Sequence, residues 1–268
     1  MATMQWVKDF YSKQNQWLGI YLGEVEPLHH ERAELIDQLW RARNMANKTE
    51  NLPTSLPRAL ELGAGGGQTA VALAQLGYAL TTVELLPDSA AHTIKLANEY
   101  ALDIQALIAD FYEVNLPASS FDIIAYFDSF GIGSDADQRL LLSRIARWLK
   151  TGGAAVAVIE IGATWFWATT AKGQSMDLGS CQRTYDFDPE QSRLLDHWAL
   201  HSAPDEVFSQ SLRCYTPADL RLLADGTGLR LCGLKAGGRV NYTTLSYQAE
   251  GVDLGDCMTY YSFWELAD

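Results

Sequence analysis

A glycine-rich segment preceded by an acid has the residue types of a ligand-binding turn. It reads ALELGAGGGQTA at residues 59–70, where Glu61 precedes Gly63, Gly65 and Gly67. Glycines let a ligand approach the backbone, and the N-terminus of a following helix offers unpaired N–H groups. The G-x-G-x-G spacing differs from the G-x-G-x-x-G of dinucleotide-binding folds, and no P-loop lysine follows. A nucleotide-like cofactor is predicted, and a phosphate-binding loop is the weaker interpretation.

Glu61 narrows the choice of cofactor, because its carboxylate would repel a pyrophosphate and attract a cation. A sulfonium that also carries an α-amino group fits this charge. Three further acids end the next predicted strands: Glu84 in TTVEL, Asp110 in LIADFYEV and Asp128 in FDIIAYFDSFG. A carboxylate where Glu84 stands can accept hydrogen bonds from both hydroxyls of a ribose. Acids at four successive strand ends predict a cofactor site at this edge of a sheet.

These motifs resemble those of the class I S-adenosylmethionine-dependent methyltransferases, whose first motif is an acid followed by G-x-G-x-G. The resemblance covers residues 56–162 by motif and the rest of the chain by the order of its elements. It implies S-adenosyl-L-methionine as cofactor and S-adenosyl-L-homocysteine as product, with Asp110 on the adenine amino group and Phe111 on its ring. The residues carried over as cofactor-binding are Glu61, Gly63, Ala64, Gly65, Gly67, Glu84, Leu85, Asp110, Phe111, Phe127 and Asp128.

Methyl transfer from a sulfonium is an in-line displacement, for which a protein mainly supplies alignment, desolvation and, for an oxygen nucleophile, a base. Ligands of open α/β sheets lie outside the carboxyl ends of the strands, so Tyr126, Asp128 and Glu160 are candidate catalytic residues. His29, or its neighbour His30, is a candidate base, since histidine titrates near neutral pH.

Aromatic residues are the candidates for contacts with the substrate. Trp165 and Trp167 either face an apolar or cationic substrate group or anchor a lid on the sheet. Tyr11, Trp17 and Tyr21 have a spacing that suits one helix face folded over the cofactor, and it suits an ordinary core equally well. We carry Tyr21, Trp165 and Trp167 forward as substrate candidates.

Several substrate classes are disfavoured by the sequence. The Asn-Pro-Pro-aromatic box of methyltransferases that act on adenine or glutamine is absent, because the equivalent strand end reads YFDSFG. With 20 basic and 33 acidic residues the net charge is −13, which disfavours nucleic acid as a partner. We expect methyl transfer to an N or O nucleophile of a small metabolite. An amine is attractive because Asp128 and Glu160 could hold its cation.

Other functions are carried as alternatives. A peptide or protein methyltransferase of the same fold would need an open acidic groove, whereas the long aromatic insertion favours an enclosed site. A non-catalytic cofactor-binding interaction subunit would usually show an eroded glycine motif, and this motif is intact. A nicotinamide oxidoreductase disagrees with the glycine spacing and with Glu61.

The elements that must position these residues follow from the hydrophobic pattern. From residue 58 onward strands and helices alternate, which predicts a Rossmann-like, doubly wound α/β fold with a mostly parallel sheet. With the resemblance, we expect seven strands, the last antiparallel. We expect one methyltransferase domain at 1–268: an N-terminal helical cap (1–55), a cofactor-binding core (56–162), an inserted lid of three antiparallel strands (163–215) and a C-terminal helix with a final strand pair (216–268).

Composition sets the remaining expectations. A chain of 268 residues with 48% hydrophobic content can bury a full core. Its four cysteines match no zinc spacing, and HxxxH at His197 and His201 lacks a metalloprotease glutamate, so we expect no metal. The first residues lack the apolar run of a signal peptide, and no apolar run is long enough to span a membrane. We expect a cytoplasmic protein that binds no membrane, and the oligomeric state stays open.

Overall fold

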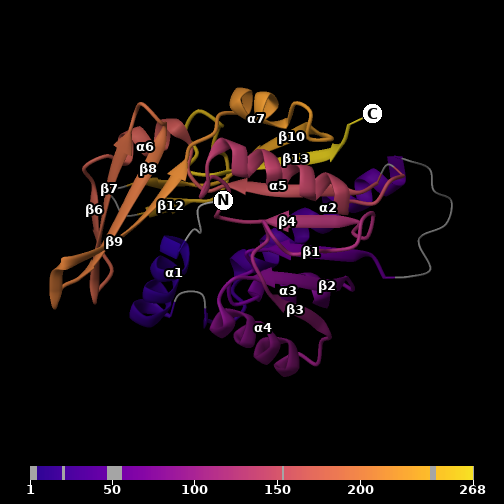
Figure 1. The fold of residues 1–268 in the computed structure, drawn as a ribbon, viewed down its shortest axis with the longest axis horizontal. Coiled ribbons are helices and arrows are strands. Elements are labelled where there is room, and N and C mark those ends of the chain that lie inside the picture. Colours follow the sequence, from indigo (N-terminus) through magenta and orange to yellow (C-terminus); the bar gives the residue numbers. More distant parts are fainter. Residues whose placement is uncertain (1–4, 20–21, 47–55, 153, 242–245, 268) are drawn as a thin grey trace.

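The computed structural model describes residues 5–19, 22–46, 56–152, 154–241 and 246–267. Its centre is a seven-stranded sheet with the order β10-β13-β5-β4-β1-β2-β3 (Figure 1). The strands are β1 (Arg58–Leu62), β2 (Ala79–Glu84), β3 (Ile104–Ile108), β4 (Ile123–Tyr126), β5 (Val156–Ile161), β10 (Leu229–Ala236) and β13 (Tyr260–Leu266). β13 runs antiparallel to both of its neighbours, β10 and β5, and the other pairs in this sheet are parallel. The predicted Rossmann-like sheet with an antiparallel last strand is therefore confirmed.

Helices cover both faces of this sheet. One face packs against α2 (Pro27–Ala46), α3 (Gln68–Gln75) and α4 (Pro87–Glu99), and the other against α5 (Asp135–Trp148) and α7 (Pro217–Ala224). The N-terminus of α5 is fixed by a capping box in which the Ser134 side chain accepts from the N–H of Asp137 and the Asp137 carboxylate accepts from the N–H of Ser134. Thr216 and Asp219 cap α7 in the same way. In the sequence, Ser134 and Thr216 each stand three residues before an aspartate, which is the pattern of a capping box.

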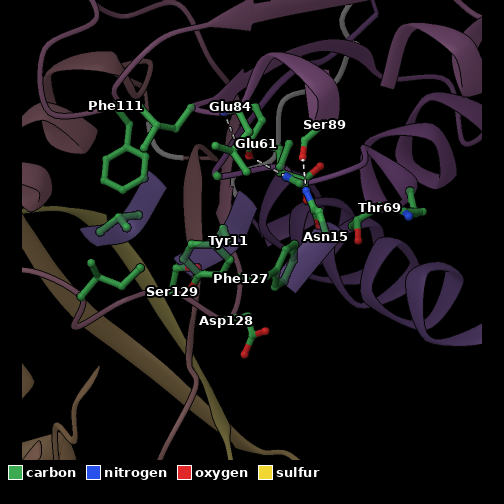
Figure 2. Close-up of a pocket in the computed structure, with 18 of the residues that line it drawn as sticks. Tyr11, Asn15, Glu61, Thr69, Glu84, Ser89, Phe111, Phe127, Asp128 and Ser129 are labelled. Atoms are coloured by element: carbon green, nitrogen blue, oxygen red, sulfur yellow. Dashed lines mark hydrogen bonds between the residues drawn. The ribbon is translucent and has the colours of Figure 1, made fainter. Parts of the chain in front are cut away.

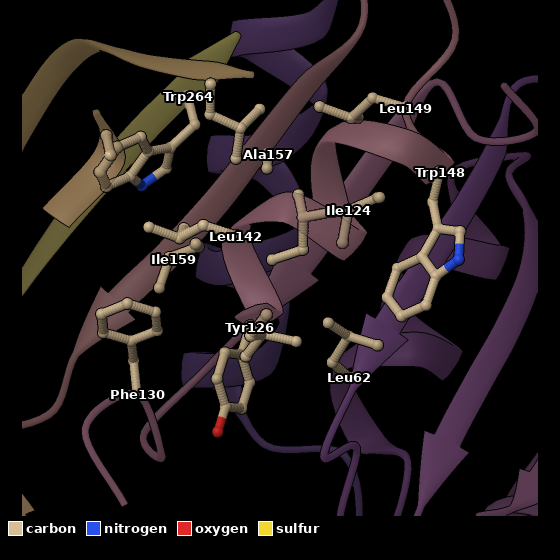
Figure 3. Packing of buried hydrophobic residues seen from close by; sticks show 14 of the residues in the cluster. Leu62, Ile124, Tyr126, Phe130, Leu142, Trp148, Leu149, Ala157, Ile159 and Trp264 are labelled. Carbon is tan, nitrogen blue, oxygen red and sulfur yellow. The ribbon is translucent and has the colours of Figure 1, made fainter. Parts of the chain in front are cut away.

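The core strands are apolar on both sides because helices cover both faces. In β4, Ile124 and Tyr126 lie in the cluster under α5, whereas Ile123 and Ala125 face the α2 and α3 side. Figure 3 shows the first of these clusters, with Trp148 of α5 packed beside the strands. Because β1 to β5 are parallel, their carboxyl ends, where the acids lie, are at one edge of the sheet.

A second, four-stranded antiparallel sheet follows β5 and precedes α7. It comprises β6 (Ser175–Asp177), β7 (Cys181–Asp188), β8 (Arg193–Leu200) and β9 (Ala203–Arg213), and we call it the lid sheet. α6 (Trp165–Ala171) packs on one side of the lid sheet, where the ring of Trp165 meets that of Phe187 and the ring of Trp167 meets that of Tyr185. α1 (Gln5–Leu18) packs on the sheet through Phe10, which clusters with Cys181 and Trp198 (Figure 1).

Two local expectations were incomplete. The lid was expected to have three strands, and it has a fourth, β6, preceded by α6, where Thr164 accepts a hydrogen bond from the N–H of Trp167 at the helix N-terminus. A short hairpin of β11 (Arg239–Asn241) and β12 (Ser246–Gln248) precedes β13 and was not expected. Strands of three residues, such as β6, β11 and β12, are too short to show the alternation of apolar and polar residues by which a strand is recognised in a sequence. Among the described helices, none combines the length and apolarity needed to cross a bilayer.

Candidate active site

One cavity of about 850 Å³ lies at the carboxyl ends of the central strands and extends beneath α1 (Figure 2). Of the residues expected to bind cofactor, it is lined by Glu61, Gly63, Ala64, Gly65, Glu84, Leu85, Asp110, Phe111, Phe127 and Asp128. Figure 2 shows Glu61, Glu84 and Phe111 around the same space as Tyr11 and Ser129. The structure therefore brings together residues that the sequence places on four strand ends.

The glycine turn needs its glycines for backbone geometry as well as for access. Gly63, Gly65 and Gly67 have positive φ angles of 59°, 54° and 81°, which side-chain-bearing residues rarely adopt. A Cβ at Gly67 would also lie 2.4 Å from Oγ1 of Thr93 in α4. Gly67 does not line the cavity in this structure, and its small size serves the packing of α3 against α4.

Glu61 is a buried carboxyl group at the base of the glycine turn, with 4% of its surface exposed. Burial raises its pKa to about 8, although the charge of Arg32 and a hydrogen bond from the backbone of Ala70 act in the opposite direction. Within the described part of the chain, Oε2 of Glu61 has no hydrogen-bond partner. A buried oxygen of this kind fits a cationic ligand group.

Glu84 ends β2, and its carboxylate is held by the backbone. Oε2 accepts from the N–H of Gly65 and Oε1 from the N–H of Leu86, both at 2.8 Å. Burial raises the pKa of Glu84, and these hydrogen bonds oppose the shift. Each carboxylate oxygen has a second lone pair. The fixed carboxylate therefore has the acceptor capacity that a pair of ribose hydroxyls requires.

Asp110 and Phe111 follow β3 at the far end of the cavity. Oδ1 of Asp110 accepts from the N–H of Tyr112 at 2.8 Å, which fixes the turn. The ring of Phe111 meets the ring of Tyr126 edge-on, with centroids 5.2 Å apart. An acceptor beside an aromatic face suits an adenine, which carries an amino group and a flat ring.

Asp128 follows β4 in an unusual backbone conformation, with a φ of 66°. Its carbonyl oxygen would lie 2.7 Å from a Cβ added to Gly162, the residue after β5. A non-glycine residue in this conformation is strained, and such strain often lies at functional sites. Asp128 lines the cavity beside Ser129.

Arg32 of α2 is a cavity residue that the sequence analysis missed. Its guanidinium pairs with Glu160 at 2.6 Å and lies 4.7 Å from the ring centre of Phe127. Its Nε is buried and has no hydrogen-bond partner among the described residues. Since the pair joins α2 to β5, only the tertiary structure reveals it. Glu160 is occupied by this ion pair and does not line the cavity.

The other candidates occupy different surroundings. His29 lines the cavity, its Nδ1 accepts from the N–H of Glu26, and burial lowers its pKa. Tyr126 is fully buried in the core and Trp167 is buried against Tyr185, and neither lines the cavity. Trp165 is 46% exposed on α6, away from the cavity. Tyr21 lies outside the described residues. The structure therefore brings only Asp128 and His29 of the catalytic candidates to the cavity.

The wall beneath α1 contains polar residues that the sequence analysis did not assign. They are Gln5, Lys8 and Asn15 of α1, Ser89 of α4, and Ser129 and Asp137 on the opposite side. Tyr11, which the helical spacing placed over the cofactor or in the core, lines this wall too. A helical spacing was the only signal for α1, since its contacts are with the distant strand β9. The described residues contain no group of histidine, cysteine and acidic side chains that could hold a metal ion.

Comparisons with known proteins agree with this geometry. Residues 59–153 match the family model described as "Methyltransferase domain". The CcbJ methyltransferase from Streptomyces caelestis is similar in structure, with 20% identity, a TM-score of 0.68 and 92% of each chain covered. An S-adenosylmethionine-dependent methyltransferase from Clostridium acetobutylicum shares 12% identity, with a TM-score of 0.66 and coverage of 98% of this chain and 100% of that one.

A third structure is described as an amino pentose methyltransferase with its S-adenosylmethionine bound, CalS10 from Micromonospora echinaspora. It shares 16% identity at a TM-score of 0.52, over 88% of this chain and 91% of that one. No curated protein matches the chain in sequence. At these identities the similar structures establish a shared fold, and the family match places a methyltransferase domain at the glycine turn and the strand ends.

Proposed function

We propose that this chain is an S-adenosylmethionine-dependent methyltransferase of the class I fold, which methylates an N or O nucleophile of a small molecule by in-line displacement. The observation that carries the proposal is a cavity lined both by most of the predicted cofactor residues and by the wall beneath α1. S-adenosylmethionine supplies the methyl group on a sulfonium when it is bound. The protein supplies its position and the exclusion of water.

The residues present fit this cofactor. The buried Oε2 of Glu61 without a partner suits the α-ammonium group, and the fixed carboxylate of Glu84 suits the ribose. Asp110 and Phe111 suit the adenine, as the family resemblance implies. Arg32 adds a cation with a buried N–H beside the cavity, which suits the carboxylate of the amino-acid part.

The size and lining of the cavity favour a small acceptor over a peptide. Its volume of about 850 Å³ is within the range of small-molecule sites. α1 covers part of it, and α1 is itself held by Phe10 in a buried cluster with Trp198 of the lid sheet. An extended peptide would need an open groove in place of this covered wall.

An amine is the acceptor that the charges favour. Asp128 lines the cavity, whereas the charge of Glu160 is matched by Arg32, so Asp128 alone remains of the two acids expected to hold an amine cation. His29 has a pKa below its ordinary value, so it is neutral near pH 7 and able to accept a proton. The similar structure CalS10 is described as an amino pentose methyltransferase, which agrees with an amino group on a small polar molecule.

Calorimetry with S-adenosylhomocysteine tests the cofactor assignment. We expect micromolar binding and no binding of NAD, and the reverse result would contradict the proposal. Replacing Gly65 by Asp should abolish binding while the fold is retained, because the new side chain would enter the cavity. Unchanged affinity in Gly65→Asp would place the cofactor elsewhere.

A screen of acceptors with isotopically labelled S-adenosylmethionine tests the substrate class. Amines, amino sugars, phenols and short peptides are offered in parallel, and products are identified by mass. We expect methylated small molecules, with amines foremost. Methylation confined to peptides would favour the second hypothesis, a protein methyltransferase.

A further inference from the structure

The lid sheet contains a buried carboxylate surrounded by donors. Asp196 of β8 is fully buried, and it accepts two hydrogen bonds from Arg183, each 2.8 Å long. It also accepts from the indole N–H of Trp198 at 3.0 Å and from the side-chain amide of Gln210 at 2.7 Å. A carboxylate in a bidentate pair with arginine is ionised and can only accept.

This arrangement determines which way the amide of Gln210 faces. Because Asp196 can only accept, Gln210 presents its Nε2 to Asp196. Its Oε1 then faces α1, where it accepts the hydroxyl proton of Tyr11 at 3.2 Å. A tyrosine hydroxyl has one proton, so any further hydrogen bond of this oxygen is one that it accepts.

Tyr11 is at the boundary between the lid sheet and the cavity. Its oxygen lies 3.5 Å from Oγ of Ser129, next to Asp128 at the end of β4. Burial raises the pKa of Tyr11, and the charges of Asp128, Asp196 and Glu84 act in the same direction. Tyr11 lines the cavity together with Asp128 and Glu84. With its proton directed toward Gln210, its lone pairs are directed toward Ser129 and the cavity.

We propose that Gln210 is a positioning residue that makes the Tyr11 hydroxyl a hydrogen-bond acceptor toward the methyl-transfer region of the cavity. The inference rests on the proposed function, since it presumes S-adenosylmethionine between Glu61 and Glu84. It specifies the acceptor: the group that meets Tyr11 is a hydrogen-bond donor, an amine or a hydroxyl, and an acceptor without an N–H or O–H is disfavoured.

Sinefungin is a probe that tests this without a known substrate, because it carries an ammonium-bearing carbon where S-adenosylmethionine carries the methylated sulfur. S-adenosylhomocysteine has neither group at that place. The experiment measures the dissociation constants of both by calorimetry in the wild type, Tyr11→Phe, Gln210→Met and the double variant. Ser209→Ala is the matched control, since Ser209 is the exposed neighbour on β9 that contacts His197 instead.

We expect Tyr11→Phe to weaken sinefungin about ten-fold relative to S-adenosylhomocysteine, the loss of one hydrogen bond to a charged group. Gln210→Met should shift the ratio in the same direction although it does not line the cavity, and it should add nothing in the Tyr11→Phe background. Ser209→Ala should match the wild type. Tyr11→Phe removes one atom and keeps the ring contact with Phe10, so it tests the Tyr11 hydroxyl as an acceptor independently of Gln210→Met.

An unchanged ratio in Tyr11→Phe, or equal losses for both ligands, would overturn the inference and leave Tyr11 a packing residue. Additive effects of the two substitutions would overturn the role of Gln210. A wild-type protein that binds neither ligand would instead contradict the proposed function, so the two failures are distinguishable.

Discussion

Glu61 is a buried acid whose charge depends on what occupies the cavity. With a pKa of about 8, it is mostly protonated near pH 7 when no ligand cation lies beside it. A ligand ammonium group would favour the ionised form, so binding and loss of the proton are linked.

We therefore expect S-adenosylhomocysteine to bind more weakly as the pH falls below 8, by up to about ten-fold per pH unit. At pH 7 binding should release a proton, measured by calorimetry in buffers of different ionisation enthalpy. Glu61→Gln should bind weakly with a flat pH profile and no proton release. A wild-type affinity that is constant from pH 6 to pH 8 would contradict this role for Glu61.

The glycines of the turn differ in the reason each is required. Gly63 and Gly67 both have positive φ, but a Cβ at Gly63 has ordinary contacts of 3.4 Å or more, whereas a Cβ at Gly67 would overlap Thr93. We expect Gly63→Ala to lower the free energy of unfolding by about 1 kcal/mol from backbone strain. Gly67→Ala should cost about 2 kcal/mol or more, because overpacking is added to strain.

Urea denaturation measures both of these losses in the absence of ligand. Equal losses of unfolding free energy in the two variants would mean that Thr93 moves away from the new Cβ at position 67 without a measurable energy. The glycine motif in the sequence does not distinguish Gly63 from Gly67, because the overlap with Thr93 involves a side chain of another helix.

At the scale of elements, α1 is the helix that closes the cavity. It contributes Lys8, Tyr11 and Asn15 to the wall, and its anchor is Phe10, which is buried and meets Trp198 edge-on at 6.2 Å. Because α1 contacts the lid sheet through few buried residues, its docking depends on this ring.

Removing that ring should detach α1 without unfolding the sheet. Phe10→Ala loses about 3 kcal/mol of packing. It leaves α1 held by Val7, by the edge-on contact of Trp17 with Phe208 and by the hydrogen bond of Tyr11 with Gln210. We expect faster proteolysis within residues 5–18 and weaker binding of S-adenosylhomocysteine, with central-sheet stability unchanged. Gln16→Ala, at an exposed position of α1, is the matched control. Wild-type proteolysis rates in Phe10→Ala would show that α1 is held by other contacts.

At the scale of the whole molecule, the ion pair of Arg32 and Glu160 joins the N-terminal helices to the central sheet. Both side chains are largely buried, at 16% and 6% exposure. Burial raises the pKa of Glu160 above its ordinary value, and the charge of Arg32 opposes this shift.

Arg32→Met should destabilise the fold by about 3–5 kcal/mol, because it leaves a buried charge without its partner. Adding Glu160→Gln to Arg32→Met should recover part of this loss, since the uncompensated charge is then gone. Thermal and urea denaturation of both single variants and the double variant measure the coupling. Fully additive losses would contradict a direct interaction between the two groups.

The sequence predicted the central fold because each strand and helix carries its own pattern and the crossover rule assembles them. For the same reason it placed Glu61, Glu84 and Asp110 at the carboxyl ends of β1, β2 and β3, which lie side by side and meet one cavity. Their contacts with a cofactor stay a prediction. It failed where position depends on pairing between distant segments. Glu160 was expected to face a substrate because nothing in its own strand reveals Arg32, and the wall formed by α1 depends on contacts with β9.

The close approach of Asp128 to Gly162 has a consequence for engineering the acceptor site. The carbonyl of Asp128 occupies the space that any side chain at position 162 would need. Residues at the two positions therefore form one unit, although they follow different strands. A scaffold that receives the loop after β4 from this chain must carry a glycine at the position equivalent to Gly162, or the transplanted loop will adopt a different path.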